Sequence, residues 1–231
     1  MNIVDQGKCP YLPNRRWVSR AFATGHLTGA VYESLINDGW RRSGSVFYQN
    51  CCPGCSLCIP IRVPVSEFVM SDSQRRVMRR NRDVEVSYHE IAPDEAIWQL
   101  YRTYQRERHG DRAEDGESWE SYAEFLGKSP VPTLVMRYTL RDVLIGAGWV
   151  DTLPEGLSSV YFVYDPRHAN RSLGTLSALH ELRFASELGR QWYYLGFFVP
   201  GCSSMSYKAR FRPYELLIDG RWHRWSTRPR R

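Results

Sequence analysis

Four of the six cysteines in this 231-residue chain lie within eight positions, in the segment CCPGCSLC. Two residues separate Cys52 from Cys55 and Cys55 from Cys58, so three thiolates can turn toward one point. Such a set supplies most of the sulfur ligands of a tetrahedral metal site or an iron–sulfur cluster. Cys9, far upstream in a segment with two prolines, is the natural fourth ligand. We therefore predict one thiolate site formed by Cys9, Cys52, Cys55 and Cys58, with Cys51 as a near neighbour.

Two other interpretations of these cysteines remain open: a disulfide pair, or a set of small buried side chains. The chain begins MNIVDQGK, with charges where a secretory signal carries its apolar region, and no apolar run is long enough to cross a membrane. Clustered cysteines without a secretory signal are more often metal-binding or catalytic than bridged. We expect a cytoplasmic, monomeric protein that does not bind a membrane.

The segment SDSQRRVMRRN, residues 71–81, is a second candidate site. It starts with residues favoured at a helix N-terminus and then places Arg75, Arg76, Arg79 and Arg80 on adjoining turns. No acidic residue interrupts this set, and only three of the 31 basic residues in the chain are lysines. The pattern predicts contacts with the phosphate backbone of an RNA partner. The alternative is an ordinary solvated helix face.

The rest of the sequence indicates a mixed α/β protein. Apolar periodicity predicts helices at 29–40, 94–109, 119–126 and 173–188, and strands at 46–48, 61–65, 84–88, 133–140, 144–152, 157–164, 192–198 and 213–218. The composition changes near residue 70, which predicts a cysteine-rich domain at 1–70 and a second domain at 71–231. Antiparallel strands, then a strand leading into a helix, then further strands is the element order of the GNAT acyltransferase-like fold.

The segment RSLGTL, which starts at Arg171, precedes the helix at 173–188. It resembles the R-x-x-G-x-G/A loop with which the GNAT fold grips a pyrophosphate at a helix N-terminus. Leu176 replaces the second small residue, so a plain helix entry explains the segment equally well. Arg171 is nevertheless a candidate substrate-binding residue.

A series of short motifs, in one order along nearly the whole chain, resembles the aminoacyl-tRNA:protein transferases. This family comprises bacterial leucyl-tRNA enzymes and eukaryotic arginyl-tRNA enzymes. Two positions depart from its pattern: Ser204 stands where lysine is usual, and Cys51 stands where another polar residue is typical. The motifs are GWRRSG at 39–44, the cysteines of 52–58, SQRR at 73–76, RRN at 79–81, VY and YDP within 160–166, SLG at 172–174, YLG at 194–196, MSYK at 205–208 and FRP at 211–213.

The resemblance implies a GNAT-like fold with a small N-terminal cysteine-rich metal-binding domain. It also implies transfer of an amino acid from aminoacyl-tRNA to the N-terminal Asp or Glu of acceptor proteins, which creates a destabilising N-terminus (N-degron). Leucine is the expected amino acid, and arginine is the alternative. The eukaryotic relatives suggest an iron–sulfur cluster in the thiolate site, with zinc as the alternative, and no CoA is expected.

An acidic acceptor side chain requires a cation to bind it. Lys208 and Arg212 are the first candidates, because they flank a segment that follows the last core strand, and Arg42 and Arg76 are the second. Lys208 is one of only three lysines, and an ammonium is a compact point charge that arginine does not replace in kind. The candidates to orient the reacting groups or accept a proton are Tyr194, Tyr207 and Lys208.

Two rival classes of protein share part of these features. A CoA-dependent N-acetyltransferase would have the same fold and would use the RSLG segment for pyrophosphate. A non-enzymatic, zinc-containing RNA-binding protein would explain the cysteines and arginines but would leave the second domain without a role.

Overall fold

We describe a computed structural model of residues 1–109 and 118–226. The N-terminal part forms a four-stranded antiparallel sheet in the order β1-β2-β4-β3. Helix α1 packs beside this sheet, and the side chain of Thr28 accepts a hydrogen bond from the backbone of Val31 at its first turn. The elements are β1 (Asn2–Lys8), β2 (Arg16–Ala23), α1 (Gly29–Asn37), β3 (Arg41–Ser43) and β4 (Val46–Asn50).

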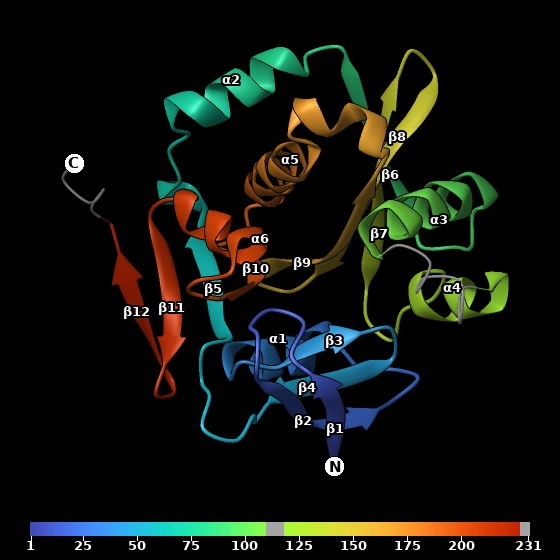
Figure 1. Ribbon diagram of the computed structural model, residues 1–231. Coiled ribbons are helices and arrows are strands. Elements are labelled where there is room, and N and C mark those ends of the chain that lie inside the picture. The colour runs from blue at the N-terminus through green and yellow to red at the C-terminus, as the bar shows by residue number, and fades with distance from the viewer. Residues whose placement is uncertain (110–117, 227–231) are drawn as a thin grey trace.

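An eight-stranded sheet in the order β12-β11-β5-β10-β9-β8-β7-β6 forms the rest of the framework (Figure 1). The cysteine loop leaves the small sheet at Asn50 and enters the large one at Ile59, so β5 lies between β10 and β11. The chain therefore passes from the small sheet to the large sheet at the cysteine loop, whereas the predicted domain boundary lies near residue 70. The strands are β5 (Ile59–Pro64), β6 (Val84–Glu90), β7 (Thr133–Leu140), β8 (Val143–Thr152), β9 (Gly156–Tyr164), β10 (Trp192–Phe198), β11 (Tyr214–Ile218) and β12 (Arg221–Trp225).

Strands β9 and β10 form the parallel pair of this sheet, and they pair only near their beginnings. Trp192, Tyr193 and Tyr194 lie opposite residues 156–158, after which β9 continues beside β8 and β10 continues beside β5. The two strands therefore diverge and leave an opening within the sheet. This opened parallel pair, together with the mixed α/β architecture, confirms the predicted GNAT-like fold.

Helices cover both faces of the large sheet. On one face, α5 (Leu173–Glu187) packs its leucines into the main core and contacts α2 (Asp72–Arg80). On the other face, α3 (Glu95–His109) and α4 (Trp119–Leu126) enclose an aromatic core around Trp149 (Figure 1). Short helices complete the chain: η1 (Val65–Glu67), η3 (Pro166–Arg171), α6 (Ser203–Ser206) and η4 (Tyr207–Arg210). None of the described helices is long and apolar enough to cross a membrane.

Candidate active site

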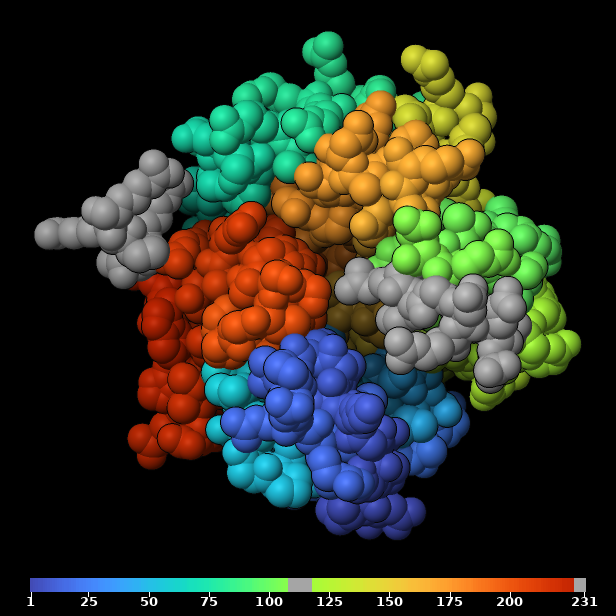
Figure 2. Space-filling model, in the orientation of Figure 1, coloured from blue at the N-terminus to red at the C-terminus, as the bar shows by residue number. Residues whose placement is uncertain are grey.

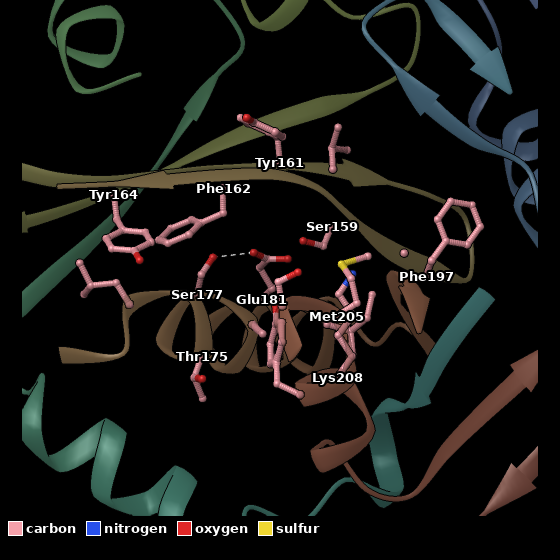
Figure 3. A pocket seen from close by; sticks show the side chains of 18 of the residues that line it. Ser159, Tyr161, Phe162, Tyr164, Thr175, Ser177, Glu181, Phe197, Met205 and Lys208 are labelled. Atoms are coloured by element: carbon pink, nitrogen blue, oxygen red, sulfur yellow. Dashed lines mark hydrogen bonds between the residues drawn. The ribbon is translucent and has the colours of Figure 1, made fainter. Parts of the chain in front are cut away.

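A cleft of about 470 Å³ lies where β9 and β10 diverge. The opening is hollowed between the N-terminal segment, α5 and the α6–η4 segment (Figure 2). In Figure 3, Ser177 and Glu181 of α5 point toward β9, and Met205 and Lys208 lie beside them. Residues from distant parts of the chain line the cleft, among them Tyr11, Arg41, Arg42, Ser159, Tyr161, Gly174, Glu181, Tyr193, Gly196, Tyr207 and Lys208.

Lys208 enters the cleft from η4, close to Arg41. A Cβ atom on Gly196 would lie 3.4 Å from Lys208 Nζ and 3.8 Å from Arg41 Nη2, so both cations approach the same point of β10. Gly196 has a φ angle of +86°, which favours glycine and lets the side chains come close. Burial, and then repulsion from Arg41, lower the pKa of Lys208 to about 7. Lys208 therefore exchanges between an ammonium and a neutral amine near neutral pH.

Arg41 and Arg42 are adjacent and both buried, but their partners differ. Arg41 donates from Nη2 to the Ser159 carbonyl oxygen at 2.5 Å. Arg42 donates from Nε and Nη2 to the two carboxylate oxygens of Asp151 at 2.7 and 2.5 Å, and the Asp151 side chain is fully buried. Arg42 therefore already pairs with a carboxylate of this chain, although it borders the cleft.

Glu181, which sequence reasoning missed, lies at the inner end of the cleft with an exposed fraction of 1%. Its carboxylate accepts hydrogen bonds from Ser177 Oγ at 2.7 Å and from the Tyr193 hydroxyl at 2.8 Å. The Ser159 hydroxyl is a third neighbour that acts to lower the pKa of Glu181. Burial raises the pKa of Glu181, while these hydroxyl groups and Lys208 act to lower it. The available signal was a serine and a glutamate four residues apart on the leucine-rich, buried face of helix α5.

The three predicted catalytic residues do not lie together. Tyr207 and Lys208 line the cleft. Tyr194 is 1% exposed in a separate core cluster, where its hydroxyl donates to Asn37 Oδ1 at 2.8 Å. Burial raises its pKa to about 12. Its neighbour Tyr193 occupies the cleft side of β10 instead.

The predicted anion loop borders the cleft at the start of α5, where Leu173, Gly174 and Thr175 line it. Arg171 itself turns away, because its guanidinium donates to both carboxylate oxygens of Asp83 at 2.8 and 3.0 Å. The structure thus brings the glycine of the motif to the cleft and engages its arginine in an ion pair.

The arginine-rich segment forms α2 as predicted, with a capping box between Ser71 and Gln74. Arg75 pairs with Asp72 at 2.6 Å, and Arg80 donates to the Asn170 carbonyl oxygen at 2.5 Å. Arg76 and Arg79 are exposed. A separate hollow beside α2 is lined by Arg75, Arg210 and Arg212. Arg212 therefore lies with this basic surface, while Lys208 lies in the cleft.

The predicted thiolate residues Cys9, Cys52, Cys55 and Cys58 all line one cavity of about 240 Å³. Burial, and then the neighbouring thiols of the other three, raise the pKa of Cys58 to about 12. Cys51 is exposed. As placed, no three His, Cys, Asp or Glu side chains within residues 1–109 and 118–226 are arranged to hold a metal ion. The four sulfur donors that line this cavity nevertheless match the chemistry of a tetrahedral thiolate site.

The opened parallel pair and the cleft within it define a GNAT-like fold. Among solved structures, this fold is similar to L-PGS from Bacillus licheniformis, with a TM-score of 0.50 and 13% identity over 73% of this chain and 58% of that one. A C-terminal domain (DUF2156) from Agrobacterium fabrum gives a TM-score of 0.53 and 12% identity, also over 73% of this chain and 58% of that one.

Sequence comparison identifies the family within this fold to which the chain belongs. Residues 7–76 match the family model described as the N terminus of arginine-tRNA-protein transferase, and residues 96–218 match the model of its C terminus. The chain belongs to the aminoacyl-tRNA:protein transferase family, as its motifs predicted. It is 37% identical to an aspartate/glutamate leucyltransferase from Aeromonas salmonicida and 39% identical to one from Aeromonas hydrophila, each over 99% of this chain and 96% of the relative. A relative of the same name from Chromobacterium violaceum is 36% identical over 93% of this chain and 89% of its own length.

Proposed function

We propose that this protein transfers leucine from leucyl-tRNA to the α-amino group of proteins that begin with Asp or Glu. The observation that carries the proposal is the match to aspartate/glutamate leucyltransferases over nearly the full length of both chains. The ester bond of an aminoacyl-tRNA is already activated, so the enzyme must chiefly align amine and ester and accept a proton. The cleft in the opened sheet supplies a place for this alignment.

Lys208 and Arg41 are the cations that read the acidic side chain of the acceptor. Both approach the same point of β10 within the cleft. Burial disfavours the charge of Lys208, and an incoming carboxylate would restore it by pairing with the ammonium. Tyr207 lines the same cleft and is placed to orient a reacting group.

The tRNA would approach over α2. Its exposed arginines, and the basic hollow of Arg75, Arg210 and Arg212 beside them, present cations to a phosphate backbone. This surface continues toward the start of α5, because Arg80 contacts Asn170 and Arg171 contacts the backbone of Arg80. An acceptor stem on α2 could therefore extend toward the cleft entrance.

Cys9, Cys52, Cys55 and Cys58 would hold an iron–sulfur cluster or a zinc ion. The bound group would supply sulfur–metal bonds that hold the N-terminal segment against the loop after β4, and the transfer reaction needs no step at the metal. Anaerobic purification with absorption spectroscopy and metal analysis distinguishes iron from zinc. Cys52→Ser is expected to lose the metal and the exposed Cys51→Ser to keep it; wild-type protein that is folded and active without any metal would contradict this proposal.

One assay tests the proposed activity. Purified protein is given leucyl-tRNA or arginyl-tRNA, together with peptides that begin with Asp, Glu, Asn, Lys or Arg. We expect labelled leucine on the Asp and Glu peptides and little transfer to the others. Transfer from arginyl-tRNA in place of leucyl-tRNA would show that arginine is the transferred amino acid. Transfer to peptides that begin with Lys or Arg would contradict the proposed acceptor specificity.

A further inference from the structure

Among the residues that the structure describes, none forms an ion pair with the carboxylate of Glu181, which is buried at the inner end of the cleft. Within residues 1–109 and 118–226, its close partners are the hydroxyl groups of Ser159, Ser177 and Tyr193. Asp151, the other deeply buried carboxylate near the cleft, is paired with Arg42. Because buried carboxylates are costly unless paired or well hydrogen-bonded, the arrangement at Glu181 requires an explanation.

Three hydroxyl donors do not fill the hydrogen-bonding capacity of this carboxylate. A carboxylate has about four acceptor positions on its two oxygens. Ser177 occupies one position on Oε1 and Tyr193 one on Oε2, and the Ser159 hydroxyl can occupy at most a third. Since Glu181 lines the cleft, a ligand with an N–H group can donate a hydrogen bond to an acceptor position that remains on its carboxylate.

The acceptor of the proposed reaction carries two opposite charges on its first residue. One is the α-ammonium group, and the other is the side-chain carboxylate of Asp or Glu. The cleft contains a matching pair of charges: the Glu181 carboxylate on α5, and the Lys208 and Arg41 cations beside β10. Figure 3 shows Glu181 and Lys208 coming from neighbouring segments into the same space.

We propose that Glu181 binds the α-ammonium group of the acceptor protein and takes one of its protons during transfer. The inference rests on the proposed leucyl transfer. The freed amine then attacks the ester carbonyl carbon, a C–N bond forms, and the C–O bond to the tRNA ribose breaks. The nitrogen gives up a second proton, which goes to the departing ribose oxygen. The proton on Glu181 returns to solvent.

Two features of the surroundings suit this role. Burial makes the carboxylate more basic than an exposed one, since it raises the pKa of Glu181. The charged and titratable groups that face it are Tyr138 on β7, Tyr193 on β10 and Lys208 on η4. Both tyrosines have pKa values raised well above their usual range by burial, so they stay neutral donors. A purely structural role, in which Glu181 only ties α5 to β10, is the alternative.

A pair of peptides separates the two roles without any tRNA. One peptide begins with Asp, and the other begins with a succinyl group, which keeps the side-chain carboxylate but lacks the α-amine. We expect wild-type protein to bind the Asp peptide roughly 10- to 100-fold more tightly, the range for a hydrogen bond to a charged group. Glu181→Gln is expected to abolish this preference and to leave binding of the succinyl peptide nearly unchanged.

Glu33→Gln is the matched control. Glu33 is also a buried carboxylate, and it accepts hydrogen bonds from the Glu155 backbone at 3.1 and 3.0 Å, away from the cleft. This variant should keep the amine preference. A folded Glu181→Gln protein that also keeps the preference overturns the inference. If that variant does not fold, equal affinity of the wild type for the two peptides overturns it instead.

The same experiment distinguishes failure of the inference from failure of the proposed function. Wild-type protein that transfers leucine normally, with no preference for the peptide amine, contradicts the role of Glu181 alone. Wild-type protein that transfers no leucine to any peptide contradicts the proposed function, whatever the peptides show about binding.

Discussion

The buried Arg42 and the half-buried Lys208 are cations that border the same cleft, but their surroundings differ. Arg42 is held by both oxygens of Asp151, by Thr133 Oγ1 at 3.1 Å and by the Gly44 carbonyl oxygen at 3.1 Å. Lys208 has Arg41 as a close cationic neighbour that lowers its pKa, and Cys202 and then Glu181 oppose this effect only in part. The difference teaches that burial alone does not mark a binding residue. A charge that the fold has already paired holds the structure together, whereas an under-compensated charge remains available to a ligand.

Breaking the Arg42–Asp151 pair should have the largest effect on stability. Arg42→Met leaves the Asp151 carboxylate buried and unpaired, which should lower the free energy of unfolding by about 3–5 kcal/mol. Urea unfolding measures this loss. Arg183→Met, which breaks an exposed pair with Glu187, is the control and should cost less than about 1 kcal/mol. If Arg42→Met lowers the free energy of unfolding as little as Arg183→Met does, the Arg42–Asp151 pair does not have the stabilising role assigned to it.

The arginines of α2, the proposed tRNA-binding surface, show the same contrast between cations that are paired within the chain and cations that are not. Arg75 and Arg80 have partners in this chain, whereas Arg76 and Arg79 project from α2. Replacing Arg76 and Arg79 with Ala should reduce the slope of log affinity for tRNA against log salt by about 2, near one unit for each phosphate contact. Salt-dependent tRNA binding measures it. An unchanged slope would make α2 an ordinary solvated face.

Lys208→Met should have a smaller effect on stability, and one of opposite sign. The pKa of Lys208 is about 7 in the folded protein, compared with its ordinary value of 10.5. Below pH 7 both states carry the proton, so the full cost of burying the charge is present. Between pH 7 and 10.5 the unfolded state binds more protons, and the stability of the wild type rises with pH.

We therefore expect Lys208→Met to be more stable than the wild type by about 1 kcal/mol below pH 7, with a smaller difference at higher pH. Unfolding curves from pH 6 to 9 measure the trend. If Lys208→Met is less stable than the wild type at pH 6, the Lys208 ammonium gains more from interactions in the folded protein than its burial costs, which contradicts this prediction.

Much of the framework followed from sequence pattern. The predicted helices and the three-strand meander form, because strong periodicity and turn residues specify them locally. The four predicted thiolate residues line one cavity, and the metal site itself stays a prediction. Strands β1, β2, β3 and β12 were missed. Strands β1 and β12 lie at sheet edges and carry mostly exposed residues with no clear apolar alternation.

The candidate site was harder to predict, because its chemistry depends on distant contacts. Arg41 and Arg42 are neighbours in sequence, and only the packing of Asp151, 109 residues later, shows which one is already paired. Glu181 acquires its setting from Tyr193 on β10. Tyr194 was preferred over Tyr193 from its family motif, yet strand pleating places Tyr193 at the cleft.

The most direct test of the account compares peptides that begin with Asp and with Asn, which have nearly the same shape and differ in charge. The measurement is kcat/KM for leucine transfer by the wild type and by Lys208→Met. We predict that the wild type prefers Asp and that Lys208→Met reduces this preference by about 10- to 100-fold, the value of a charge-assisted contact. An undiminished preference for Asp in active Lys208→Met enzyme would contradict the assignment of Lys208 as the residue that reads the acidic side chain.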